Sequence, residues 1–278
     1  MKTDEASNQW ELAAPGWAKW EDVISSAVVS ATNMMFDMAG VVKGKHVLDL
    51  ASGAGSQTIM AAQRVGPSGH VVANDISKTM LNHVHQNASA ANLSNISTLL
   101  GAVQELEISP SSFDAVICRF ALMLFAEPAI VLANVHQALK LNGKIGVAVF
   151  STPQANQFFV KPMQILLRHA GKSPAPGGPG LFSLGAPGTL KNLFEVNHFV
   201  NVEICYLNVV FQMPSATQTL TMIQEAFGAY RAVIGDSPES VQRAAWNEVL
   251  EYLKSIETDN GIEAPAEVIV GSAQKPTP

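Results

Sequence analysis

Short apolar segments of strand length alternate with helical segments between residues 44 and 150, and this alternation constrains the fold more than any other feature. Strands joined by helices pair in parallel through right-handed crossovers, and such a sheet is buried on both faces. The expected strands are 45–50, 70–75, 96–102, 113–120 and 142–150, and the expected helices are 56–65, 78–91 and 128–140. We therefore expect an α/β fold with a doubly wound, mainly parallel sheet.

The alternation stops after Phe150, where the remaining segments extend the sheet and cover it. Two more strands are expected at 199–211 and 266–273, which gives a seven-stranded sheet. Helices at 217–234 and 238–256 fall between these two strands. The expected organisation is an N-terminal helical cap over 1–40, a ligand-binding core over 41–150, and 151–278 with a helical lid insertion at about 213–257. Within the cap, apolar residues at helical spacing predict a helix from about Glu21 to Met38.

The composition excludes several classes of protein. The formal net charge is −6, which argues against a broad nucleic-acid surface. No apolar run approaches the roughly 20 residues that a membrane span requires, and the polar start lacks the apolar core of a signal peptide. The only cysteines, Cys118 and Cys205, cannot form a disulfide framework or a thiolate metal site. We expect a cytoplasmic protein that uses no metal.

The stretch "VLDLASGAGS" places a glycine turn between the first strand and the first helix of the core. Gly53 and Gly55 allow close approach of backbone N–H groups to a ligand. Asp75 ends the next strand, from which a carboxylate can accept both ribose hydroxyls. A dinucleotide fingerprint would carry a third glycine where Thr58 stands. Asp49 would repel a pyrophosphate and suits a cationic amine, which S-adenosylmethionine has together with a ribose.

At this point the chain resembles the class I S-adenosylmethionine-dependent methyltransferases of small molecules. "VLDLASGAGS" resembles their first motif, "VVANDIS" the second, "LLGAVQEL" the third, "FDAVICRFALMLF" the fourth, and "LKLNGKIGVAVF" the stretch leading into strand five. The resemblance covers residues 44–150 well. It implies a Rossmann-like methyltransferase fold, an S-adenosylmethionine cofactor and S-adenosylhomocysteine as product.

The resemblance also implies the residues of the cofactor site. Asp49 would contact the amine, Asp75 the ribose, and Ile76 and Met80 the two faces of adenine. The other implied positions are Ala51, Gly53 and Gly55 in the turn, Ala102 and Val103 near adenine, and Cys118, Arg119 and Phe120 at the methionine end, through backbone groups. Ala51 replaces the first glycine of the motif, and Ala102 stands where relatives often have an aspartate.

The acceptor is less constrained by the sequence. Met123 aligns with an arginine of the methyltransferases of ubiquinone and menaquinone synthesis, which favours some other small, largely apolar acceptor. Candidate acceptor-binding residues are Trp17, Trp20, Met123, Phe158, Met163, Phe227 and Tyr230. The only candidates for a catalytic base are His169, at a helix end, and Tyr230, in the lid.

Several alternatives stay open from the sequence. The methylated atom could be oxygen, nitrogen or carbon, and the chain could be a monomer or a homodimer. A methyltransferase fold could also bind the cofactor while catalysing another reaction, such as cyclisation, or act as a non-catalytic partner. A nicotinamide oxidoreductase is a fourth possibility, which ligand binding would distinguish.

Overall fold

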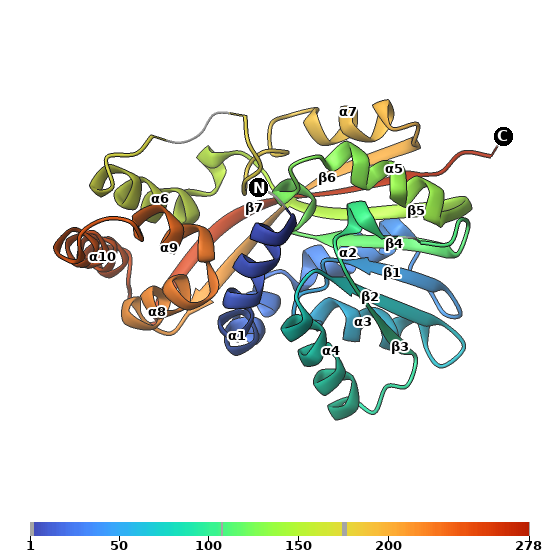
Figure 1. The fold of residues 1–278 in the computed structure, drawn as a ribbon, viewed down its shortest axis with the longest axis horizontal. Coiled ribbons are helices and arrows are strands. Elements are labelled where there is room, and N and C mark those ends of the chain that lie inside the picture. Colours follow the sequence, from blue (N-terminus) through green and yellow to red (C-terminus); the bar gives the residue numbers. More distant parts are fainter. Residues whose placement is uncertain (1–2, 107, 174–176, 278) are drawn as a thin grey trace.

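A seven-stranded sheet forms the centre of the molecule in the computed structural model, which describes residues 3–106, 108–173 and 177–277 (Figure 1). Its strands are β1 (His46–Leu50), β2 (His70–Asp75), β3 (Ile96–Leu100), β4 (Phe113–Arg119), β5 (Leu139–Phe150), β6 (Val200–Met213) and β7 (Ile262–Gln274). They lie in the order β3-β2-β1-β4-β5-β7-β6, and β7 runs in the opposite direction to the other six. The expected doubly wound, mainly parallel sheet is confirmed.

Helices cover both faces of this sheet. They are α1 (Thr3–Ala27), α2 (Val29–Ala39), α3 (Ser56–Val65), α4 (Lys78–Ala90), α5 (Pro128–Ala138), α6 (Gln157–His169), α7 (Thr189–Val196), α8 (Ala216–Ala226), α9 (Gly228–Ile234) and α10 (Glu239–Ser255). Strands β1, β2 and β3 follow one another from the middle of the sheet to one edge. Strand β4 then lies on the other side of β1, and β5 follows it towards the opposite edge. Right-handed crossovers therefore place α3 and α4 on the opposite face from α5. The carboxyl ends of β1 and β4 meet at the point where the order reverses.

Local sequence explains why the core elements begin and end where they do. The hydroxyl of Ser77 accepts a hydrogen bond from the Met80 backbone N–H at 3.1 Å and caps α4, as its sequence position predicts. Pro128 is the first residue of α5, where its missing N–H costs nothing. The strands next to the reversal point are buried, with residues 47–50 of β1 and 115–118 of β4 out of contact with solvent.

The N-terminal region differs from the sequence-based expectation. A helix was expected to begin near Glu21, but α1 begins at Thr3 and ends at Ala27, where Val28 breaks the path before α2. Pro15 lies inside α1, where it removes one backbone hydrogen bond. The helix persists because its small and aromatic residues are packed on both sides, and Ala13 and Ala14 are fully buried. Helix α7 was not expected at all.

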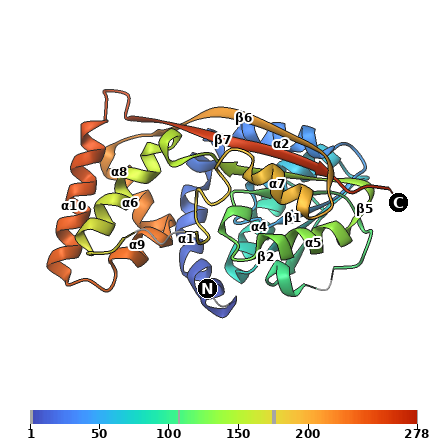
Figure 2. The ribbon, with the colours of Figure 1, turned by 90° about the horizontal axis from the view of Figure 1, so that it is seen from above.

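Four helices form a second lobe beside the sheet (Figures 1 and 2). Helices α8, α9 and α10 lie between β6 and β7 in the chain, and α6 packs against α9 and α10. Strands β6 and β7 are long enough to reach from the sheet into this lobe. We refer to α6, α8, α9 and α10 as the helical lobe.

Helix α1 lies between the helical lobe and the core (Figure 1). It contacts α8, α9 and β6 on one side and α3 and α4 on the other. It lies close to α8 at Gly16, where a Cβ atom would stand 2.2 Å from the backbone carbonyl oxygen of Glu225. Glycine at this position therefore sets how closely α1 and α8 pack.

We predict that Gly16→Ala separates α1 from α8 and destabilises the protein. Overpacking typically costs about 1–3 kcal/mol, which outweighs the roughly 0.5–1 kcal/mol that alanine gains over glycine inside a helix. Thermal unfolding with tryptophan fluorescence measures the effect, because Trp17 and Trp20 lie on the same helix. Ser26→Ala, at an exposed position of α1, is the control. Equal stability of the two variants would contradict the prediction.

Candidate functional site

Two buried carboxylates lie at the carboxyl ends of neighbouring strands. Asp49 comes from β1 and is fully buried, and Asp75 ends β2 with 6% of its surface exposed. The strands pair in parallel, with Asp49 opposite Ala73 and Leu50 opposite Asn74, so both carboxylates and the glycine turn share one edge of the sheet. This edge is where open α/β sheets bind ligands.

Asp49 is held by the first turn of α3. Its oxygens accept hydrogen bonds from Gln57 Nε2 at 2.5 Å and from Thr58 Oγ1 at 2.6 Å. Burial raises the pKa of the Asp49 carboxyl to about 7, while the hydrogen bonds from Thr58 and Gln57 and the charge of Arg119 oppose this rise. Thr58, which stands in the position of the third glycine in a dinucleotide motif, therefore has a structural task of its own.

Asp75 joins the glycine turn to the start of α4. Its oxygens accept backbone N–H hydrogen bonds from Gly53 and from Ser77, each at 2.9 Å. Burial raises the pKa of Asp75, and these backbone hydrogen bonds oppose the rise. A ribose hydroxyl that approached this carboxylate would share it with the Gly53 N–H.

The residues of the glycine turn have different tasks. Nothing lies within 4 Å of the position that a Cβ atom of Gly53 would take, so the backbone there is open to a ligand. A Cβ atom at Gly55 would stand 2.9 Å from Val84 of α4, so this glycine serves the packing of α3 against α4. Ala51 adopts the left-handed conformation, with φ of 50°, at the position where relatives have glycine.

Arg119 ends β4 on the other side of Asp49. Its guanidinium donates to Thr32 Oγ1 at 2.9 Å and to Ser56 Oγ at 2.7 Å. Burial lowers the pKa of Arg119, and the negative charges of Asp49 and Glu21 oppose this. Among the described residues no carboxylate lies within 4 Å of this guanidinium. The implied role of Arg119 was through its backbone, but its side chain also belongs to the site.

Helix α1 covers this edge of the sheet with two carboxylates. Glu11 accepts hydrogen bonds from the hydroxyls of Ser77 (2.5 Å) and Thr79 at the start of α4. Glu21 accepts the backbone N–H of Ser56, the first residue of α3, at 2.7 Å. Both carboxylates thus lie at helix N-termini, where the helix dipole favours negative charge.

An apolar strip of α1 lies between these two carboxylates. Ala14 of α1 forms a buried cluster with Ala54 of the glycine turn and Met80 of α4, and Trp10 and Trp17 pack against it. The ring centroids of Trp10 and Trp17 are 6.2 Å apart. We refer to this arrangement, in which α1 lies on the glycine turn, as the closed form.

Three buried polar atoms around this edge have no hydrogen-bond partner in the structure. They are the Ser52 hydroxyl in the glycine turn, the Asn74 side-chain oxygen at the end of β2, and the Trp17 indole nitrogen. A buried unpaired polar group costs about 1–3 kcal/mol. Their concentration at one edge of the sheet indicates a polar ligand site there.

The positions implied for adenine lie beyond Asp75. Met80 is buried and Ile76 is partly buried at the start of α4. Ala102 and Val103 are buried in the short turn after β3, and the Val103 carbonyl oxygen accepts a hydrogen bond from Asn134 Nδ2 at 3.0 Å. The structure brings Asp49, Asp75, Met80 and the glycine turn to one edge, as the resemblance implied.

A continuous series of aromatic rings connects α1 to the far side of the site. The ring centroids of Trp17 and Phe227 are 5.8 Å apart, and those of Phe227 and Phe159 are 6.2 Å apart. Phe159 then contacts Phe150 at 4.7 Å, and Phe150 stacks on Phe120 at 4.7 Å. Phe120 follows β4 with a positive φ of 57°, a conformation that is costly for a bulky residue and is common at functional sites.

Other predicted acceptor residues have structural contacts. The buried Met123 uses its carbonyl oxygen to accept hydrogen bonds from the Ser183 hydroxyl (2.6 Å) and the Gly180 N–H (3.0 Å). Phe158 is buried against Phe159, and Met163 is partly buried on α6. These contacts explain their apolar character without a ligand.

Both candidate bases make their hydrogen bonds within the helical lobe. His169 hydrogen-bonds to Glu248 of α10 at 2.8 Å, within the helical lobe. Tyr230 is buried and donates its hydroxyl hydrogen bond to the Phe159 carbonyl oxygen at 2.8 Å. Burial raises the pKa of Tyr230 well above its usual value. We therefore assign no catalytic base.

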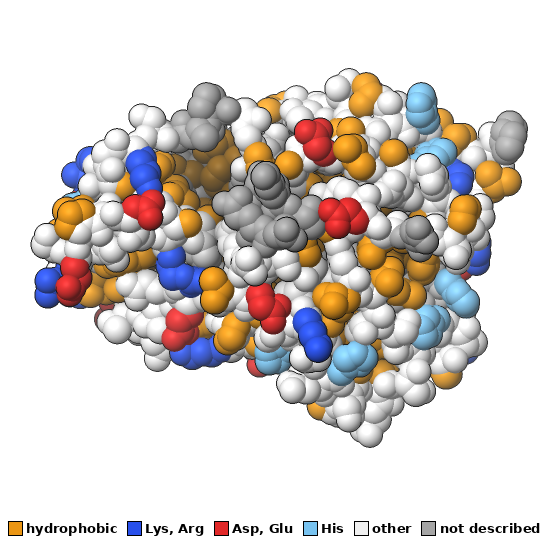
Figure 3. Space-filling model, viewed as in Figure 1, with side chains coloured by type: hydrophobic (Ala, Val, Ile, Leu, Met, Phe, Trp, Pro, Cys, Tyr) orange, Lys and Arg blue, Asp and Glu red, His pale blue; other side chains and the backbone are white. Residues whose placement is uncertain are grey.

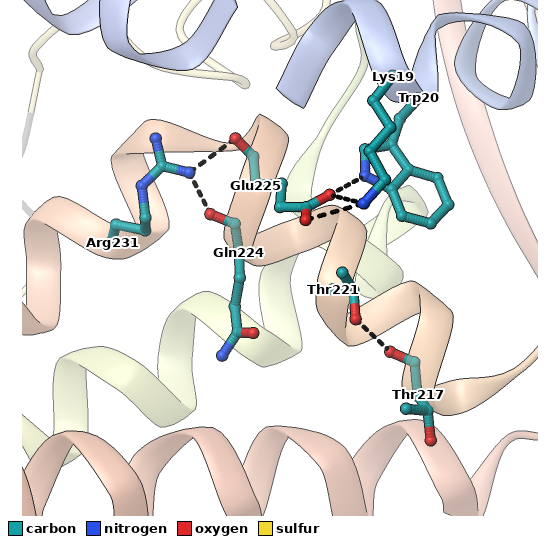
Figure 4. Close-up of polar contacts among 7 residues, drawn as sticks. All are labelled: Lys19, Trp20, Thr217, Thr221, Gln224, Glu225 and Arg231. Atoms are coloured by element: carbon teal, nitrogen blue, oxygen red, sulfur yellow. Dashed lines mark hydrogen bonds and ion pairs between the residues drawn. The ribbon is translucent and has the colours of Figure 1, made fainter. Parts of the chain in front are cut away.

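Trp20 connects α1 to α8 (Figure 4). Its indole nitrogen donates to Glu225 at 2.6 Å, and Lys19 donates to the same carboxylate at 2.7 and 2.9 Å. Arg231 of α9 donates to the backbone carbonyl oxygens of Gln224 and Glu225. Hydrogen bonds and an ion pair to Glu225 thus connect α1 to the helical lobe.

The contribution of α1 to this site was not predicted from the sequence. Glu11 and Glu21 were not singled out, although Trp10, Ala14, Trp17 and Glu21 repeat at helical spacing. This pattern could have extended the predicted helix towards the N-terminus, but a proline inside it argues for a break. Ser56 and the Arg119 side chain were missed because no sequence pattern marks a contact between distant elements.

The described residues contain no group of three or more His, Cys, Asp or Glu side chains that could hold a metal ion. In the same residues, no helix combines the length and the apolar character that crossing a membrane would require.

We predict that the Asp49 carboxyl makes stability depend on pH. Between about pH 4 and pH 7 the folded chain keeps a proton on Asp49 that the unfolded chain has released. The free energy of unfolding should therefore fall as pH rises across this window, by up to about 1.4 kcal/mol per pH unit. Asp49→Asn lacks this dependence, so it should gain stability relative to the wild type as pH rises to 7.

Urea unfolding at several pH values between 5 and 8 measures this difference. Asp114→Asn is the matched control at the opposite end of the sheet. Despite partial burial, the His46 N–H and the Lys140 ammonium hold the pKa of Asp114 below its usual value, so its contribution changes only below about pH 4. A difference between wild type and Asp49→Asn that is constant with pH would contradict the prediction.

Comparison with known proteins identifies the domain. Residues 42–169 match the family model described as a methyltransferase domain. The chain is similar to the demethylmenaquinone methyltransferase of Listeria monocytogenes serotype 4a (strain HCC23), with 30% identity over 156 residues, 56% of this chain and 65% of the relative. It is also similar to the nocamycin O-methyltransferase of Saccharothrix syringae, with 27% identity over 66% of this chain and 69% of the relative. The chain thus spans a little under two thirds of the quinone-type relative.

Solved structures share the fold. The YcgJ protein of Bacillus subtilis superposes with a TM-score of 0.61 at 15% identity, covering 90% of this chain and 99% of that chain. The [4+2]-cyclase SpnF superposes with a TM-score of 0.56 at 16% identity, covering 95% of each chain. Together with the strand order, these superpositions show a Rossmann-like methyltransferase fold, within which residues 42–169 match the methyltransferase domain.

Proposed function

We propose that this protein transfers the methyl group of S-adenosylmethionine to oxygen, nitrogen or carbon of a small, largely apolar acceptor. The observation that carries the proposal is the pair of buried carboxylates, Asp49 and Asp75, beside a glycine turn at the carboxyl ends of β1 and β2. A buried carboxylate without a neighbouring salt bridge favours a cationic ligand. The ligand implied by the family carries an ammonium group and a ribose.

The residues present fit this ligand. The space at Gly53 and the unpaired Ser52 and Asn74 side chains offer room and hydrogen-bond partners where the resemblance puts the cofactor. Asp75 would accept the ribose hydroxyls and Asp49 the ammonium group. When bound, S-adenosylmethionine supplies the activated methyl group, and the protein contributes alignment and exclusion of water.

The aromatic series supports an apolar acceptor. It runs from Trp17 through Phe227 and Phe159 to Phe120, next to the methionine end of the cofactor site, and it contains no charged side chain. Rings of this kind bind flat, apolar molecules through area and edge contacts. Met123, where the quinone methyltransferases resembled by the chain have an arginine, favours an acceptor other than a quinone.

A second reaction has a specific observation in its favour. The similarity to the [4+2]-cyclase SpnF concerns the fold alone, yet it makes a non-methylating reaction on the same framework a defined alternative. The two are distinguished by the product, because only methyl transfer converts S-adenosylmethionine to S-adenosylhomocysteine. A non-catalytic partner would bind the cofactor without either reaction.

The setting of the protein is part of the proposal. Cys118 and Cys205 are free, and free cysteines are usual in the reducing cytoplasm. On the face drawn in Figure 3, basic and acidic side chains are interspersed rather than gathered into one basic patch. Both observations support a cytoplasmic enzyme acting on a small molecule.

We predict that the protein binds S-adenosylhomocysteine and that Asp75→Asn weakens this binding about tenfold to a hundredfold. A hydrogen bond to a charged group contributes about 1.5–3 kcal/mol, and the variant removes the charge that accepts the ribose hydroxyls. Isothermal titration calorimetry measures the affinity. Asp114→Asn, which also removes a carboxylate bonded to a strand N–H, should bind as the wild type does.

Turnover completes the test. Purified protein with S-adenosylmethionine and a panel of phenolic and enolic acceptors should form S-adenosylhomocysteine with at least one of them. Stabilisation by NADH and not by S-adenosylmethionine would overturn the proposed function. Conversion of an acceptor without S-adenosylhomocysteine would favour the cyclisation alternative.

A further inference from the structure

We propose that the start of α3, together with the Arg119 guanidinium, is the seat for the carboxylate of the cofactor, and that Glu21 of α1 occupies this seat in the closed form as an internal competitor. The inference rests on the proposed function, because it concerns how the same ligand is bound. It assigns side-chain roles to Ser56, Arg119 and Glu21.

The start of α3 lacks a cap of its own. The N-cap residue is Gly55, which has no side chain to accept a hydrogen bond from the helix. The Ser56 backbone N–H, which has no partner within the helix, donates instead to Glu21 Oε1 at 2.7 Å, from 35 residues earlier in the chain. This helix end therefore accepts a carboxylate that another element must supply.

Arg119 points independently to an anion at the same place. Its guanidinium lies next to Ser56, with 2.7 Å between Nη2 and the Ser56 hydroxyl, and its other hydrogen bond goes to the Thr32 hydroxyl. Both partners are neutral. The charges of Asp49 and Glu21 act on this guanidinium without a direct hydrogen bond to it, and a bound carboxylate would give it a directly paired anion.

The two seats for charge lie on consecutive residues of one helix turn. The Ser56 backbone N–H and the Arg119 guanidinium favour an anion, whereas Gln57 and Thr58 hold the Asp49 carboxyl, which favours a cation. The amino-acid end of S-adenosylmethionine carries a carboxylate and an ammonium group on the same carbon atom. A zwitterion of that size matches one positive and one negative seat placed side by side. The unpaired Ser52 hydroxyl, with 5% of its residue surface exposed, lies in the turn that leads into α3.

Glu21 and a bound cofactor would compete for this seat. Two carboxylates at one helix end repel each other, so cofactor binding requires Glu21 to leave the Ser56 N–H. Glu21 belongs to the same helix face as Ala14 and Trp17, which pack on Ala54 of the glycine turn. Departure of Glu21 is thereby coupled to movement of α1 away from the glycine turn.

The test compares two sulfonium ligands, S-adenosylmethionine and its decarboxylated form, which differ only in the carboxylate. Calorimetry on the full chain gives the ratio of the Kd of the decarboxylated ligand to the Kd of S-adenosylmethionine. Glu21→Gln keeps a hydrogen bond to Ser56 and removes the competing charge, so we expect this ratio to rise about tenfold. Arg119→Gln removes the attracting charge, so the ratio should fall about tenfold.

Glu11→Gln is the matched control. Glu11 is also a carboxylate of α1 at a helix N-terminus, but it lies at the start of α4. Weaker packing of α1 at the start of α4 should change the Kd of both ligands by the same factor. The Kd ratio should therefore stay within about twofold of the wild-type ratio. Thermal unfolding checks that the variants are folded, and Glu21→Gln decides the outcome by itself if Arg119→Gln does not fold.

The outcomes separate this inference from the proposed function. If the wild type binds S-adenosylmethionine and Glu21→Gln has the same Kd ratio as the wild type, Glu21 is not a competitor of the cofactor carboxylate. The proposed function is unaffected by that result. A wild type that binds neither ligand would overturn both.

Discussion

The structure depends on the burial of the Asp49 carboxylate beneath the first turn of α3. A carboxylate without contact with water is costly unless hydrogen bonds or opposite charge compensate it. Gln57 and Thr58 supply two hydrogen bonds, which fixes how α3 begins and where the glycine turn lies. The compensation is incomplete, since the pKa of Asp49 rises to about 7. A cationic ligand next to Asp49 would stabilise its ionised form and complete this compensation.

The part of the site nearest to Asp49 could be predicted because it depends on local sequence. The glycine turn, the Asp75 carboxylate and the Ser77 cap lie within a strand, a turn or one helix start, and each follows a short-range pattern. The same holds for α3 and β2, whose expected bounds agree with the structure. Short-range patterns such as these survive in a single sequence because the backbone itself requires them.

The contribution of α1 could not be predicted, because it depends on contacts across long stretches of chain. Pro15 favours a break within the helix, and only packing of Ala13 and Ala14 on both sides outweighs that preference. The partners of Glu11 and Glu21 lie 66 and 35 residues away. Gly55 shows the same limit in part, because its need for glycine comes from Val84 on another helix as well as from its local φ of 102°.

The charge at the edge of the sheet that α1 covers also affects how cofactor and product exchange. Asp49, Asp75, Glu11 and Glu21 bring four carboxylates to it and Arg119 one guanidinium, so these five groups are net negative when ionised. S-adenosylmethionine carries one net positive charge and S-adenosylhomocysteine none. A net negative site favours the charged cofactor over its neutral product. Methyl transfer would thereby lower the affinity of the site for its ligand. Glu21 would return to the start of α3 as the product leaves.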